Sequence, residues 1–123
     1  MIHTVFTITI GKLKEILFDE NHRSPTFYNF QCMLDTELQP VGHKIIAVSN
    51  GIYKGKKIID LIYDKYDTNV SSKSITFADI TQKVWDLNLP DETEIYLRAK
   101  GSFEFQTIKD VRTSANVALF IPV

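Results

Sequence analysis

The stretch SITFADITQKVWD, residues 74–86, repeats the pattern of an earlier stretch of the same chain, TITIGKLKEILFD, residues 7–19. At an offset of 67 positions the apolar residues of the two stretches coincide. The same register continues without a gap into ELQPV, residues 37–41, against EFQTI, residues 104–108. Two matches in one register predict that the chain contains two copies of one structural unit.

Both stretches have the pattern of a short amphipathic helix that begins after a threonine. Thr76 is in the N-cap position of the second helix, and Asp79 stands where a capping box places its acidic residue. Thr9 is the corresponding cap of the first helix, where Lys12 replaces the acid. Apolar residues then recur at helical spacing. They are Ile10, Leu13, Ile16 and Leu17 in the first helix, and Phe77, Ile80, Val84 and Leu87 in the second.

The second helix is predicted to end at Asn88, which tolerates the left-handed cap position, and at Pro90, which prevents continuation. Asn21 and Pro25 end the first helix more loosely. Alternating apolar and polar residues then predict strands. One strand is expected in each of the segments 26–34 and 93–100, and a strand pair in each of the segments 41–63 and 107–123.

These elements predict an α+β fold, built from two duplicated αβββ-like modules with a mainly antiparallel sheet and two short helices. The first module spans residues 1–64, the polar segment 65–73 is the linker, and the second module spans residues 74–123. A unit of about sixty residues is marginal by itself. We therefore expect the two modules to share one core, in one compact unit about a pseudo-twofold axis.

Composition narrows the classes of function and the cellular location. Fourteen basic and fifteen acidic residues give a net charge of −1, and the chain has only three arginines, which disfavours sequence-specific binding of nucleic acid. Cys32 is the only cysteine, so no disulfide forms within the chain and a reducing cytosol fits. The apolar run at residues 2–10 is too short for a membrane span and lacks signal-peptide features. We predict a strand there, in a cytoplasmic protein without a membrane partner.

No motif in the chain requires a particular chemistry, and we predict neither catalytic residues nor a metal or other cofactor. The stretch GIYKGKK, residues 51–57, lacks the spacing of a phosphate-binding loop and is interpreted as a hairpin turn. Asp60, Asp64 and Asp67 are interpreted as solvated charges at a sheet edge rather than as metal ligands. Cys32 takes the position of an alanine in the second copy, so we interpret it as a small core residue rather than a nucleophile.

The remaining candidates also have structural interpretations. Trp85 stands where Phe18 stands in the first copy, which favours packing in the core or in an interface over base stacking. Trp85, Phe103 and the ends of a sheet built by duplication predict a dimer or a larger oligomer. The histidines show no metal-ligand spacing and are interpreted as surface or turn residues. They are His3, His22 and His43.

A run of residues in the second module resembles the helix, Pro-acid turn and strand of many small uncharacterised phage and mobile-element proteins. It consists of Thr76, Ile80, Leu87, Pro90, Asp91, Glu94 and Ile95. That group carries no agreed activity or catalytic residues. The resemblance therefore implies only a viral or mobile-element origin and, with it, a role against host defence in the host cytosol.

We expect from these observations a non-enzymatic binding protein that binds a host protein or sequesters a small nucleotide ligand. An anionic ligand needs cations and aromatic faces. The residues that could supply them are Tyr53, Lys54, Lys56, Arg98 and Arg112. The alternative is a structural or assembly protein that acts through homo-oligomerisation, and an enzyme ranks third.

Overall fold

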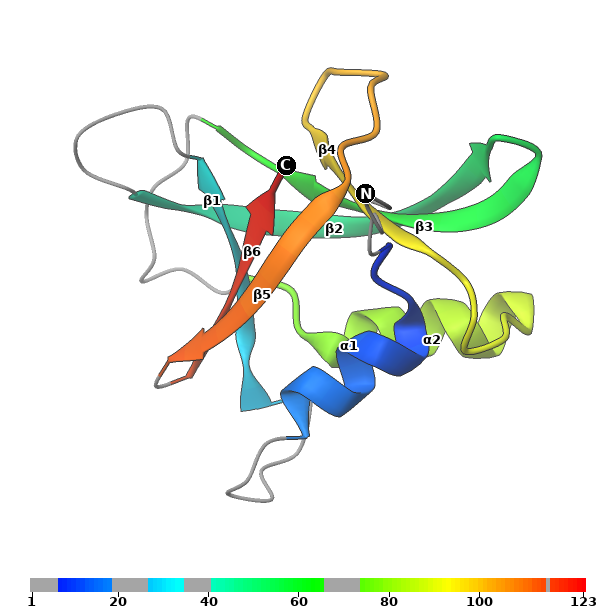
Figure 1. The fold of residues 1–123 in the computed structure, drawn as a ribbon, viewed down its shortest axis with the longest axis horizontal. Coiled ribbons are helices and arrows are strands. Elements are labelled where there is room, and N and C mark those ends of the chain that lie inside the picture. The colour runs from blue at the N-terminus through cyan, green and yellow to red at the C-terminus, as the bar shows by residue number, and fades with distance from the viewer. Residues whose placement is uncertain (1–6, 19–26, 35–40, 66–73, 115) are drawn as a thin grey trace, which may run out of the picture.

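The computed structural model describes residues 7–18, 27–34, 41–65, 74–114 and 116–123. Within these residues the chain forms one helix and three strands, and then again one helix and three strands (Figure 1). The elements of the first half are α1 (Ile10–Leu17), β1 (Asn29–Leu34), β2 (Val41–Tyr53) and β3 (Lys56–Tyr63). Those of the second half are α2 (Phe77–Leu87), β4 (Ile95–Ala99), β5 (Ile108–Ser114) and β6 (Val117–Pro122).

The six strands form one mixed sheet in the order β4-β3-β2-β1-β6-β5. Pairing is antiparallel within the first half, β1 with β2 and β2 with β3, and again between β5 and β6. The two halves meet through parallel pairs, β3 with β4 and β1 with β6. The prediction of an α+β fold is therefore confirmed. The sheet is mixed, and three of its five strand pairs are antiparallel, in agreement with the predicted mainly antiparallel sheet.

The sheet curls until its two edge strands approach each other (Figure 1). Leu97 in β4 and Gln106, just before β5, exchange both backbone hydrogen bonds, with N···O distances of 2.9 and 2.7 Å. The hydroxyl of Tyr63, in β3, also donates a hydrogen bond to Gln106 Oε1 at 2.7 Å. The curl covers part of the edges that an open sheet would expose to other chains.

Both helices begin directly after the threonine N-caps that the sequence predicts. The hydroxyl of Thr76 accepts from the backbone N–H of Ala78, and the Thr76 N–H donates to Asp79 Oδ2 at 2.9 Å, which completes a capping box. Thr9 accepts from the N–H of Lys12 without a reciprocal acid. Asn88 ends α2 in the left-handed conformation at φ 51°. The predicted end signals of the first helix, at residues 21 and 25, lie outside the described residues.

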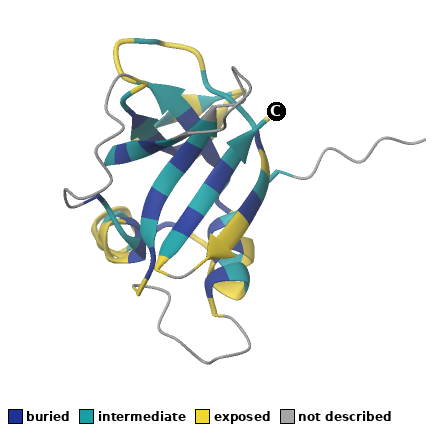
Figure 2. Ribbon diagram, turned by 90° about the vertical axis from the view of Figure 1, so that its left-hand side faces the viewer, coloured by how far each residue is buried: buried dark blue, intermediate teal, exposed yellow. Residues whose placement is uncertain are grey.

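The core is one cluster that draws on both halves, and Figure 2 shows its buried residues in alternation with partly exposed ones along the strands. Ile10, Leu13 and Leu17 of α1 are buried, as are Phe77 and Ile80 of α2. The cluster also includes Tyr28, just before β1, and from the sheet Phe30, Cys32, Ile59, Leu61, Ile95, Leu97 and Phe120. The position of Cys32 in the core, at 0% exposure, is confirmed. Burial raises the pKa of its thiol to about 12.

Each half contributes a helix that packs on the other half. The helix α1 lies against β5, and α2 lies against β2. The residue before each N-cap also bonds to the first strand of the other half. The carbonyl of Ile8 accepts from the N–H of Ile95 at 2.8 Å, and that of Ile75 accepts from Phe30 at 3.0 Å. Most of the predicted linker, residues 66–73, and most of the predicted N-terminal strand lie outside the described residues, so the boundaries at residues 64 and 74 stay predictions.

Candidate binding surface

The two hairpins of the sheet differ in length beyond a bulge that each contains. The register shifts between Ile45 and Ala47 in one hairpin and between Ile108 and Asp110 in the other. Beyond these bulges β2 and β3 form seven residue pairs, 47↔62 to 53↔56, whereas β5 and β6 form five, 110↔121 to 114↔117. The β2–β3 hairpin thus projects further from the sheet.

The projecting hairpin ends in a tight turn at residues 54 and 55, which confirms the predicted hairpin turn. Lys54 and Gly55 both have positive φ angles, 52° and 78°. This combination is typical of a two-residue type I′ turn, whose twist matches that of the flanking strands. A glycine adopts such a conformation without strain. The lysines of the turn are therefore presented from a defined backbone.

Aromatic packing fixes the tip of this hairpin onto β4 and the segment before β5. The ring of Tyr53 stacks on Tyr96 with a centroid distance of 5.0 Å and an interplanar angle of 13°. Phe105 packs on Tyr53 at 5.2 Å. The Nζ atom of Lys54 lies 5.3 Å from the centroid of the Tyr53 ring. Because neighbours already engage it, the Tyr53 ring offers less free surface for stacking on a base than an exposed tyrosine would.

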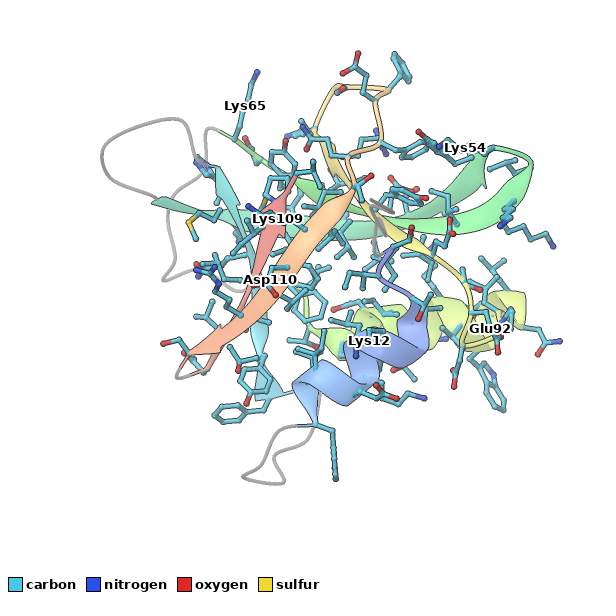
Figure 3. The ribbon with its side chains drawn as sticks, viewed as in Figure 1. Lys12, Lys54, Lys65, Glu92, Lys109 and Asp110 are labelled. Atoms are coloured by element: carbon cyan, nitrogen blue, oxygen red, sulfur yellow. The ribbon has the colours of Figure 1, made fainter. Side chains whose placement is uncertain are left out.

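The structure brings only some of the predicted ligand-binding residues together. Tyr53, Lys54 and Lys56 share the hairpin tip. Arg98 lies in β4, where its guanidinium donates from Nε to Asp60 Oδ2 at 2.7 Å and from Nη1 to the carbonyl of Ser102 at 2.9 Å. Arg112 lies in β5 and pairs with Asp110 at 3.2 Å. Figure 3 shows Asp110 well away from Lys54.

Two interpretations of single residues were wrong, and one was narrowed. Asp60 is not a solvated edge charge, because its side chain is 2% exposed and forms the ion pair with Arg98. His43 is not a surface residue, because it is 9% exposed in β2 opposite Cys32. Its Nδ1 atom has no hydrogen-bond partner among the described residues. Of the two places predicted for Trp85, the core is excluded because 83% of the residue is exposed, and packing in an interface stays a prediction. His3, His22 and Asp67 lie outside the described residues.

The last turn of α2 places large apolar side chains on the surface. The helix α2 has 11 residues, whereas α1 has eight. The additional residues are Trp85, Asp86 and Leu87, and Leu87 is 41% exposed although its spacing predicted a place on the buried face. After the cap, the N–H of Leu89 donates to the carbonyl of Val84 at 3.1 Å, which folds Leu89 back against the helix.

Two hollows meet at Leu89. The first, of about 440 Å³, lies between the β2–β3 hairpin and the end of α2, and it is lined by Asn50, Gly51, Ile52, Lys57, Ile58, Leu87 and Leu89. The second, of about 510 Å³, is lined by Thr81, Val84, Trp85, Asn88 and Leu89. Ile52 is 71% exposed beside the first hollow. We call the two hollows, together with Ile52, Trp85 and Leu87, the α2-end surface.

Charges of opposite sign border the α2-end surface. Lys57 lines the first hollow and, with the neighbouring exposed Lys56, forms what we call the basic rim. Lys54 instead lies over the ring of Tyr53. Two exposed acids form the acidic rim, namely Asp86 at the end of α2 and Glu92 in the turn after it, whereas Asp91 pairs with Lys14 of α1 at 3.7 Å. Figure 3 shows Lys54 beside the hairpin and Glu92 beside the end of α2. The surface thus has an apolar centre between two rims of opposite charge.

The part of the chain that the structure describes contains no group of three or more His, Cys, Asp and Glu side chains placed to hold a metal ion. It also contains no helix that is both long and apolar enough to cross a membrane. Comparisons of the chain with protein-family models, with curated proteins and with solved structures find no match.

The sequence did not predict Ile52, Leu87 and Leu89 as site residues, and Trp85 was predicted to pack in the core or in an interface. The signal that points to them is the difference between the two halves. The longer hairpin and the longer helix each add residues that a close repeat of the other half would lack.

Proposed function

We propose that this protein is a non-enzymatic binding protein and that the α2-end surface is its binding element. The observation that carries the proposal is the exposure of Ile52, Trp85 and Leu87, at 71, 83 and 41%, around two adjoining hollows. Full burial of a large apolar side chain contributes roughly 1.5 to 3 kcal/mol of favourable free energy relative to leaving it exposed. Contiguous apolar surface with a polar border is typical of sites that contact another protein.

The scaffold supports this role because it holds the surface rigidly. The Tyr53–Tyr96–Phe105 cluster fixes the hairpin, and the capped helix α2 fixes the opposite wall. Binding residues presented from fixed elements lose little conformational entropy when the partner binds. The shape of the surface is therefore set before the partner arrives.

We also propose that the two halves are copies of one αβββ unit, as the matched sequence predicts. The repeated element order, a bulge in each hairpin and the reciprocal packing of α1 on β5 and α2 on β2 support it. A least-squares superposition of the two halves in an experimental structure tests it. Different paths of the two helix-to-strand connections would contradict it.

The partner in this proposal is a host protein, or a small anionic ligand held at the hairpin tip. A viral or mobile-element origin, action against host defence and a place in the host cytosol stay predictions from the resemblance. Homo-oligomerisation is the second candidate function, and the two oppositely charged rims favour it specifically.

Photo-cross-linking in cells tests the proposed surface. A photoreactive phenylalanine analogue replaces Trp85 in one variant and Phe103 in a control variant, since Phe103 is also an exposed aromatic residue, at 94%, but lies in the segment between β4 and β5. We expect a covalent adduct from position 85 and none from position 103. Equal adducts from both positions, or none from position 85, would contradict the proposed surface.

A further inference from the structure

We propose that the occupant of the α2-end surface is a second copy of this chain, bound in a two-fold symmetric dimer. The inference rests on one part of the proposed function, that this surface binds another protein, and it assigns the surface to homo-oligomerisation, the second candidate function, instead of to a host protein. The dimer axis passes through the apolar centre, so that the hairpin of each copy faces the α2 end of the other.

The charge distribution is the first argument for self-pairing. A two-fold interface brings residue i of one copy to residue j of the other, and j of the first to i of the second. An axis between the basic and the acidic rim therefore places Lys57 of each copy opposite Asp86 and Glu92 of its partner. Lys56 lies at the edge of this contact, because consecutive residues of a strand face opposite sides. One type of contact is made twice, and both rims are neutralised together.

Within one copy the two rims stay apart. The ion pairs of the described residues include none between Lys56 or Lys57 and Asp86 or Glu92. The exposed side chain of Asp86 instead accepts a hydrogen bond from Gln82 at 2.9 Å, one turn earlier in α2. Among the described residues, Lys56 and Lys57 of the basic rim and Asp86 and Glu92 of the acidic rim form no ion pair, so their charges are available to a second molecule.

The apolar centre is the second argument. Ile52 comes from the hairpin side and Leu87 from the helix side of the same hollow. Across a two-fold axis, Ile52 of one copy packs against Leu87 of its partner. Trp85 of each copy lies at the adjoining hollow beside Leu89 and is covered by the partner. Apolar side chains at the middle with charges around them are the usual anatomy of a protein interface.

A second copy also fits better than a partner of one charge. An acidic partner would be attracted by the lysines of the hairpin and repelled by the acids at the end of α2. A basic partner would be attracted by these acids and repelled by the lysines. Like charges brought together in an interface are strongly unfavourable and select against the wrong partner. The chain itself carries both rims in the required arrangement.

Charge reversal with complementation tests the inference. The basic-rim variant carries Lys56→Glu and Lys57→Glu, and the acidic-rim variant carries Asp86→Lys and Glu92→Lys. The matched control carries Lys100→Glu and Lys109→Glu, two exposed lysines elsewhere that change the net charge as the basic-rim variant does. Sedimentation equilibrium at low salt measures the dimer dissociation constant of each protein, and circular dichroism verifies its fold.

We expect the wild-type protein to sediment at twice its mass of 14.1 kDa, and the control with it. Each reversed variant should dimerise at least about tenfold more weakly, since the attractive contacts that are lost and the like-charge contacts that replace them occur twice in a two-fold interface and together sum to that factor. An equimolar mixture of the two reversed variants should recover the dimer, because one copy then has two acidic rims and the other two basic rims. The recovered species must contain both variants.

A wild-type protein that stays monomeric up to its solubility limit would overturn the inference, and so would a mixture that fails to recover the dimer. These failures are distinct from failure of the proposed function. A monomer that still cross-links from position 85 to a different protein keeps the surface as a binding element and removes only the second copy as its occupant.

Discussion

Removal of Arg98 should destabilise the fold much more than removal of its partner Asp60. The two side chains form an ion pair with an Nε···Oδ2 distance of 2.7 Å, but their exposure differs, at 21% for Arg98 and 2% for Asp60. In an Arg98→Met variant the aliphatic stem remains, while the buried carboxylate of Asp60 loses its counter-charge. The reverse variant, Asp60→Asn, leaves a guanidinium that can reach water.

The magnitudes follow from this asymmetry. When one partner of an ion pair is removed and the other charge stays buried, the free energy of unfolding typically falls by about 3 to 5 kcal/mol. Because 21% of the Arg98 side chain stays in water and Nη1 keeps its bond to the Ser102 carbonyl, we expect only about 1 to 2 kcal/mol for Asp60→Asn. The double variant should cost less than the sum of the two single variants, since neither charge remains.

Urea unfolding monitored by circular dichroism gives the free energy of unfolding of each variant. Equal costs for the two single variants would refute the assigned burial, and a cost below about 1 kcal/mol for Arg98→Met would refute the pair itself. The outcome also bears on ligand binding. An Arg98 side chain that contributes nothing to stability would be available for the anionic ligand that the sequence predicts.

The other predictions concern the cap, the thiol and the hairpin tip. Thr76→Ala should lower the free energy of unfolding by about 1 kcal/mol in a urea titration, through loss of the N-cap bond; unchanged stability would contradict the cap. Cys32 should resist alkylation until the protein unfolds, because burial raises the pKa of its thiol to about 12, and modification of the native protein at neutral pH would contradict this. The stabilisation linked to that raised pKa is complete below pH 9.0 and is lost towards pH 12. The free energy of unfolding, measured as a function of pH, should therefore decrease over this range. If the hairpin tip binds nucleotides, a Tyr53→Ala, Lys54→Ala, Lys56→Ala variant should lose the thermal shift that nucleotides produce in the wild-type protein, whereas an equal shift in both would remove the tip from the ligand site.

Local features of the fold could be predicted from the sequence because their causes are local. The caps at Thr9 and Thr76 depend on residues within one turn, and the starts of α1 and α2 follow from them. The turn at Lys54 and Gly55 and the flanking strands were likewise visible in the alternation of residues 41–63.

The features that could not be predicted depend on which distant segments meet. The burial of Asp60 was missed because its counter-ion, Arg98, comes from β4, which pairs with β3 in parallel only after α2 has intervened. The parallel pair of β1 and β6 joins segments from opposite ends of the chain. Neither pairing leaves a signal in local periodicity.

The candidate site was missed for a related reason. The spacing of Leu87 places it on the apolar face of α2. The last turn of α2, however, extends past the core, so that this side chain remains exposed. Ile52 alternates correctly along β2, yet the hairpin extends beyond the sheet on which that face would be buried. Both residues have the sequence pattern of a core position and lie at the ends of elements that project from the core.

Fluorescence of Trp85 tests most directly whether the α2-end surface is an interface. Trp85 is the only tryptophan of the chain, and in a single copy it is 83% exposed, so its emission reports on this surface alone. We expect the emission to shift to shorter wavelength, and quenching by acrylamide to weaken, as the concentration of the wild-type protein rises through its dimer dissociation constant. The basic-rim variant, Lys56→Glu with Lys57→Glu, should retain the emission of an exposed indole until the acidic-rim variant is added. An emission spectrum and a quenching constant that stay those of an exposed indole at every concentration would contradict the account.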